Sequence, residues 1–133
     1  MRSLSLLPPL CLLSLTLAAC SAGAPAPRAA PTDAARIAAE CALLTQAGTM
    51  MAAAGNPAHD GLLEGCPGST ARDTRPLARQ TASLRDGGQA ALPPGVTQGS
   101  RGEAVFRRMI TRGVPVSLAS QLTADPLFAE AAR

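Results

Sequence analysis

The sequence predicts a small all-α domain, and three observations carry this prediction. Residues 34–54 are rich in alanine and place apolar side chains at intervals of three and four. Ser100 and Glu103 form a capping box ahead of a second apolar arc. Two cysteines, Cys41 and Cys66, are placed to join neighbouring helical segments. We therefore expect a disulfide-stapled helical hairpin, a Pro/Ala-rich N-terminal tether and an irregular middle segment.

Residues 1–19 have the anatomy of a secretory signal peptide. A short basic start at Arg2 is followed by the apolar stretch Leu4 to Leu17 and then by small residues. This stretch is shorter than the ~20 residues that span a bilayer, and Pro8-Pro9 interrupts it. We expect removal of the leader rather than a permanent transmembrane helix.

The end of the leader carries four residues in a specific order: Leu17, Ala18, Ala19 and Cys20. This pattern resembles the signal of bacterial lipoprotein precursors. The resemblance covers only the first twenty or so residues. It implies that the sulfur of Cys20 is acylated, with palmitate among the chains, and that cleavage leaves Cys20 as the first residue. Ser21 then favours the outer membrane, with the domain facing the periplasm. The alternatives are an inner-membrane form and a secreted form in which Cys20 has no role.

Residues 20–33 are predicted to form the lipid anchor and an extended tether, because prolines recur among alanine and glycine. Residues 34–68 follow as the hairpin. Asp33 is the expected N-cap of a helix over 34–54. One face of that helix carries an apolar stripe, with Gly48 on it permitting close approach of another segment. The stripe consists of Ile37, Cys41, Leu44, Gly48 and Met51, flanked by Leu43 and Met50.

The second arm of the hairpin is predicted as a short helix over 58–64. Asn56 offers a cap and Pro57 suits the first helical position. With Cys11 in the leader and Cys20 assigned to lipid, Cys41 and Cys66 remain as a pair, which an oxidising compartment would join. A disulfide closing a loop of this length contributes ~3–4 kcal/mol.

Residues 69–99 are predicted as a flexible or partly helical linker. A helix over 76–86 would place Leu77 and Leu84 on one face, while Gly87-Gly88 and Pro93-Pro94-Gly95 indicate turns.

Residues 100–133 are predicted as a helical segment that packs on the hairpin. Its first helix begins at the capping box and ends at Gly113. A short helix over 117–123 follows, and Asp125-Pro126 opens a last turn that carries Leu127 and Phe128. The apolar arc of the first helix consists of Val105, Phe106, Met109 and Ile110.

Three arginines, Arg101, Arg108 and Arg112, flank this arc and are the candidate contact for anionic lipid or an acidic partner protein. The alternative is a solvated rim around a buried arc. A net charge of only +3 gives no indication of a nucleic-acid partner.

The residues of a catalytic site are sparse. His59 is the only histidine, and with Asp60 and Glu64 it is a weak candidate for a metal site and a stronger one for a solvated group near a helix start. The cysteines lack the C-x-x-C spacing of a redox pair. We expect no enzyme activity, no metal or cofactor and no small-molecule substrate.

The sequence thus favours a non-catalytic lipoprotein that acts as an interaction or accessory module in the cell envelope, with an envelope protein as its partner. Two alternatives stay open: a small envelope enzyme or enzyme-associated subunit, and the precursor of a membrane-acting peptide.

Overall fold

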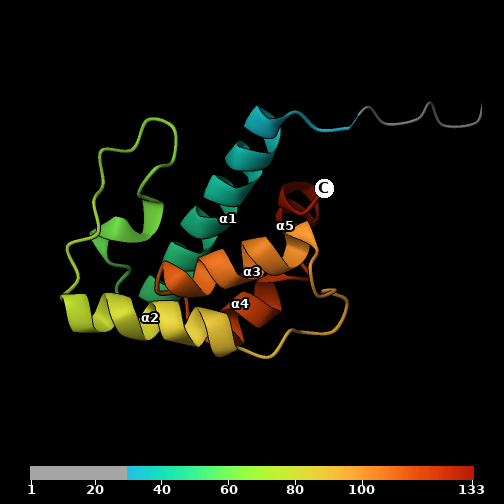
Figure 1. Cartoon of the computed structure of the whole chain (residues 1–133). Helices are drawn as coiled ribbons and strands as arrows, with labels where there is room; N and C mark the ends of the chain where they lie inside the picture. The colour runs from blue at the N-terminus through green and yellow to red at the C-terminus, as the bar shows by residue number, and fades with distance from the viewer. Residues whose placement is uncertain (1–29) are drawn as a thin grey trace, which may run out of the picture.

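A computed structural model describes residues 30–133 of the chain (Figure 1). This part is helical and contains no strand, which confirms the all-α prediction. Its elements are α1 (Asp33–Ala53), the 3₁₀ helix η1 (Asp60–Leu63), α2 (Leu77–Gln89), α3 (Arg101–Thr111), α4 (Val116–Leu122) and α5 (Pro126–Ala131). The predicted signal peptide, Cys20 and the tether up to residue 29 lie outside the described residues.

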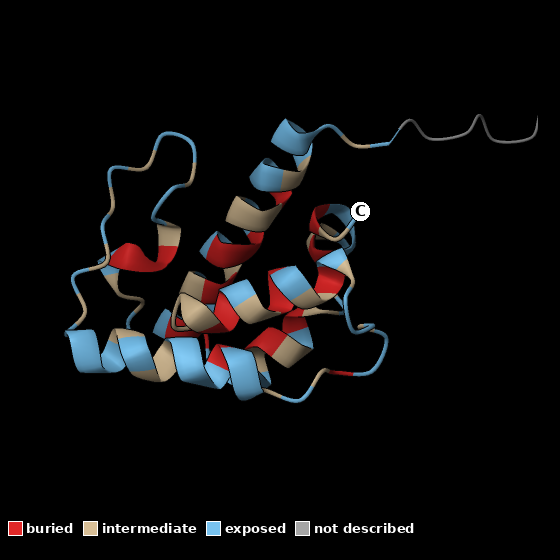
Figure 2. Ribbon diagram, in the orientation of Figure 1, coloured by how far each residue is buried: buried red, intermediate tan, exposed pale blue. Residues whose placement is uncertain are grey.

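The helices share one core, which forms where α1, α3, α4 and α5 face one another (Figure 2). The first helix, α1, packs chiefly on the last one, α5, while α2 packs on α3. Most of α2 remains exposed. The largest fully buried side chains are Phe106, Leu43, Leu44, Met109, Val105 and Val114. The apolar arc of α3 is therefore buried as predicted.

Helix α1 begins one residue earlier than expected, because Thr32 and not Asp33 is its N-cap. The Oγ1 of Thr32 accepts a hydrogen bond of 3.2 Å from the N–H of Ala35. The buried face also differs from the predicted stripe. It runs through Ala39, Leu43, Leu44, Ala47 and Met51. Ala39 and Ala47 are the small residues of this face, whereas the branched Ile37, predicted to lie on it, is 49% exposed.

The second arm of the hairpin is shorter than predicted. In place of a helix over 58–64 it contains only the 3₁₀ helix η1, Asp60–Leu63. The backbone N–H of Asn56 donates to the carbonyl of Met51, and that of Gly55 to Ala52, in a Schellman arrangement that ends α1. Asn56 thus terminates the first helix instead of starting the second. Gly48 does allow close approach, since a Cβ there would lie 3.0 Å from Leu62 Cδ2.

A disulfide joins Cys41 in α1 to Cys66 beyond η1, with the two Cα atoms 5.7 Å apart. The predicted pairing is confirmed. Because η1 is too short to be stable alone, this bond and the packing of Leu62 hold the second arm against α1.

The prediction of a turn at Gly87-Gly88 is wrong, since both glycines lie inside α2, which continues to Gln89. The reason is a tertiary contact: a Cβ on Gly87 would lie 2.7 Å from Thr111 Cγ2, so glycine lets α2 and α3 meet. Leu77 and Leu84 are 77% and 62% exposed and contribute little to the core.

The caps of the C-terminal segment agree with the sequence, except that Glu103 binds the N–H of Gly99 and not that of the N-cap Ser100. Ser100 Oγ accepts from Glu103 N at 3.2 Å, and Glu103 Oε2 accepts from Gly99 N at 2.6 Å. That second bond, assisted by Arg107, lowers the pKa of Glu103. Gly113 ends the helix with a φ of 88°. Asp125 caps α5 by accepting from Leu127 N at 2.8 Å.

Candidate functional site

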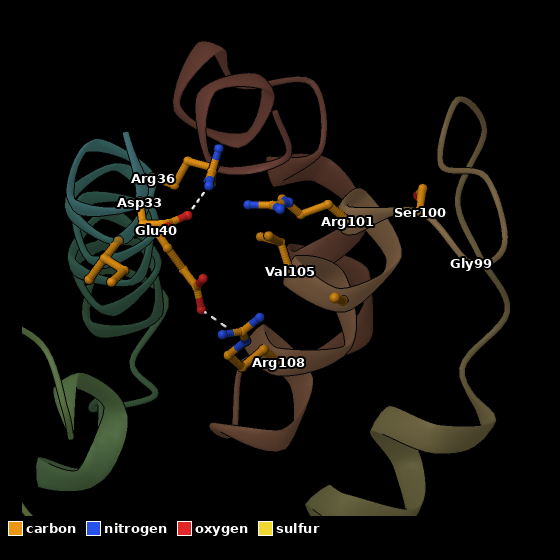
Figure 3. Close-up of a pocket in the computed structure, with 11 residues that line it drawn as sticks. Asp33, Arg36, Glu40, Gly99, Ser100, Arg101, Val105 and Arg108 are labelled. Carbon is orange, nitrogen blue, oxygen red and sulfur yellow. Dashed lines mark hydrogen bonds and ion pairs between the residues drawn. The ribbon is translucent and has the colours of Figure 1, made fainter. Parts of the chain in front are cut away.

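A groove of about 490 Å³ opens between the first turns of α1 and α3, close to the end of α5 (Figure 3). Apolar side chains, Ile37, Ala104, Val105 and Ala131, form part of its lining. The remaining lining is mostly charged: α1 contributes Asp33, Arg36 and Glu40, and α3 contributes Arg101 and Arg108. Three guanidinium groups from two helices therefore converge on one hollow.

Two of these arginines are already paired with carboxylates. Arg108 Nε lies 3.2 Å from Glu40 Oε1, and this pair bridges α3 and α1. Arg36 pairs with Asp33 and also donates to the carbonyl of Pro31 at 2.9 Å. Among residues 30–133, Arg101 forms neither a hydrogen bond nor an ion pair, and its side chain points across the groove (Figure 3). Arg101 is thus the groove's available cation.

Arg112 lies apart from the groove, so the three arginines predicted as one flank are divided. Its Nη1 donates to the carbonyls of Leu62 and Glu64 at the end of η1. In place of Arg112, the groove gains Arg36, which sequence reasoning missed. The only signal for Arg36 was its position three residues after Asp33 at a helix start.

A second polar cluster surrounds the C-terminal end of α3. The guanidinium of Arg75 binds Asp73 in a bidentate pair, with Nε–Oδ1 at 3.0 Å and Nη2–Oδ2 at 2.6 Å. The same guanidinium donates to the carbonyl of Thr111 at 3.1 Å and to Ser83 Oγ at 2.9 Å. Hydrogen bonding to Arg75 lowers the pKa of Asp73 from 3.8 to about 2. Arg75 therefore fastens the irregular segment 69–76 to α2 and α3.

His59 belongs to this cluster. Its Nε2 lies 2.6 Å from the carbonyl of Arg112, so this nitrogen carries the proton and donates. Its Nδ1 is buried without a hydrogen bond, 4.0 Å from Asp73 Oδ1. The residues proposed to assist it in a metal site do not gather there: residues 30–133 hold no group of three possible His, Cys, Asp or Glu ligands.

A larger hollow, about 960 Å³, lies between α1 and the segment 58–74. Its lining combines small, hydroxyl and apolar groups, including Thr45, Gly48 and Leu63. Asp60 and Arg72 are exposed at its edge, so no set of charged groups converges inside it.

The last turn of the chain is part of the packed domain, because Phe128 is only 6% exposed and Leu127 packs against the core. Within residues 30–133, every helix is too short or too polar to cross a membrane.

Comparison with known proteins found no matching family model, no similar curated protein and no similar solved structure.

Proposed function

We propose that this chain is a non-catalytic, lipid-anchored lipoprotein of the outer membrane, whose periplasmic helical domain serves as an interaction or accessory module. The observation that carries the proposal is the order Leu17-Ala18-Ala19-Cys20 at the end of an apolar leader. Acylation at Cys20 would add ~0.8 kcal/mol of membrane affinity per buried CH₂, and two or more chains give stable attachment.

The disulfide supports an exported location, because such bonds persist in oxidising compartments and are rare in the cytosol. The pairing of Cys41 with Cys66 also leaves Cys20 available for acylation. Roughly a dozen residues separate Cys20 from the cap of α1 at Thr32, and such a length spans at most about 40 Å. The domain would therefore stay close to the membrane.

Binding is favoured over catalysis by the state of the chain's only histidine. The Nε2 of His59 already donates to a backbone carbonyl, and its Nδ1, the nitrogen left to accept a proton, is buried, so neither ring nitrogen is open to a substrate as a general base. A metal that co-purifies with the protein and is lost in His59→Ala would instead favour the envelope enzyme.

The test is metabolic labelling with palmitate followed by membrane fractionation. Cys20→Ser should abolish labelling and prevent the membrane attachment that follows leader cleavage. Cys11→Ser is the matched control, because it removes a cysteine of the leader and should leave labelling intact. Label retained in Cys20→Ser would overturn the proposal. A density gradient then separates outer-membrane from inner-membrane attachment.

A further inference from the structure

The groove between α1 and α3 combines three arginines with an apolar lining at one end of the domain (Figure 3). We propose that it binds the phosphate of an anionic phospholipid head group. The proposal rests on the lipid-anchored function for the membrane it names, but its test requires no anchor.

The charges of the groove favour an anion. Three guanidinium groups face two carboxylates, and each carboxylate is engaged by one arginine: Asp33 by Arg36, and Glu40 by Arg108. The charge of Arg101 has no counterpart among the described residues. The groove therefore carries one uncompensated positive charge, which a monoanionic phosphodiester would neutralise.

The arginines also keep unused donors. A guanidinium has five N–H groups, and its planar fork matches phosphate oxygens. Arg108 engages Glu40 through Nε. The Nε of Arg36 is buried, so this guanidinium can meet a ligand only through the remaining N–H groups of its two Nη atoms. Charge-assisted bonds to phosphate are stronger than those between neutral groups, so a ligand supplying several acceptor oxygens is favoured here.

The position of the groove favours a lipid over an acidic protein. Its walls include the first two turns of α1, directly after the point where the chain from Cys20 enters the domain (Figure 1). A tether drawn from Thr32 pulls this end of the domain toward the bilayer. Ile37, half exposed beside the arginines, would meet the apolar boundary below the head groups.

The test measures co-sedimentation of residues 20–133 carrying Cys20→Ser with vesicles. All core residues lie between Ala39 and Ala131, so this chain retains the whole described core. Vesicles that contain phosphatidylglycerol in phosphatidylcholine should bind the protein at low salt, and vesicles of phosphatidylcholine alone should not.

Arg101→Gln should weaken partitioning of the protein onto the phosphatidylglycerol vesicles roughly fivefold. Arg79→Gln, which removes another exposed arginine, from α2, is the charge-matched control and should change partitioning less than twofold. Circular dichroism verifies the fold of each variant.

Three results would overturn the proposal. Equal losses in Arg101→Gln and Arg79→Gln would show attraction by net charge alone. Binding of inorganic phosphate that is lost in Arg101→Gln, with no binding to phosphatidylglycerol vesicles, would assign the groove to free phosphate. Binding of polyglutamate through Arg101, with no binding to phosphatidylglycerol, would assign it to an acidic protein.

Discussion

Asp73 shows how one carboxyl group couples the stability of the domain to pH. Its folded pKa of about 2 lies below the ordinary value of 3.8, chiefly because Arg75 binds the ionised form. The carboxylate therefore stabilises the fold above about pH 4, and this contribution is lost as the pH falls toward 2. At neutral pH we expect it to be about 1–2 kcal/mol.

The corresponding prediction compares Asp73→Asn with the original chain in urea titrations between pH 7 and 2. The variant should be about 1–2 kcal/mol less stable at pH 7, and the difference should shrink as the pH approaches 2. Asp60→Asn is the control, since Asp60 is an exposed carboxylate outside the Arg75 cluster. A difference that stays constant down to pH 2 would contradict the role assigned to the ionised pair.

At the scale of elements, the contact of α2 with α3 depends on one of two adjacent glycines. A Cβ on Gly87 would meet Thr111 Cγ2 at 2.7 Å and the carbonyl of Arg107 at 3.1 Å, whereas one on Gly88 would meet open space. Gly87→Ala should therefore destabilise the domain by about 1–3 kcal/mol by separating the helices. Gly88→Ala should stabilise it by about 0.5–1 kcal/mol through helix propensity. Thermal unfolding followed at 222 nm measures both, and effects of the same sign would refute the packing argument.

The disulfide stabilises the arm of the hairpin that contains η1. Replacing Cys41 and Cys66 with serine should cost about 3 kcal/mol. The loss should be concentrated in the segment around η1, because Cys66 lies directly after η1 and its bond to Cys41 ties that arm to α1. Limited digestion with trypsin should then cut faster after Arg72, while cleavage after Arg79 in α2 stays slow. Equal acceleration at both arginines would indicate global rather than local loosening.

At the scale of the whole molecule, one small core supports the fold, so its largest buried ring has a large effect. Phe106 is fully buried, and Phe106→Ala should cost about 3–5 kcal/mol of the roughly 5–15 kcal/mol typical of a domain. Leu77→Ala, at a side chain 77% exposed, should cost less than about 0.5 kcal/mol. Circular dichroism in urea is the suitable measurement, because the chain has no Trp or Tyr.

Local chemistry made part of this molecule predictable. The N-cap at Ser100, the cap at Asp125 and the arc around Phe106 depend on neighbouring residues, and the structure confirms all three. The Cys41–Cys66 pairing followed from the assignment of the other cysteines and is also confirmed.

Features that depend on tertiary neighbours were missed. Ile37 was placed on the packing face, but the buried face of α1 runs through the smaller Ala39 and Ala47, and Ile37 is exposed. The grouping of Arg36 with Arg101 and Arg108 requires α1 and α3 to lie side by side, and spacing within one helix cannot show this. Arg112 was predicted beside Arg101 and Arg108, but it lies apart from them because its guanidinium donates to the carbonyls of Leu62 and Glu64.

The packing of α1 on α5 joins the first and last helices of the described chain, and Gln46 Nε2 reaches Asp125 Oδ2 across it at 2.8 Å. A growing chain cannot complete this core until its final helix has been synthesised. Until α5 has been made, the part of the apolar face of α1 that packs on α5 thus stays uncovered and open to chaperones. For the exported protein proposed above, a core that stays incomplete until α5 has been made would suit passage through a channel that admits only unfolded chains.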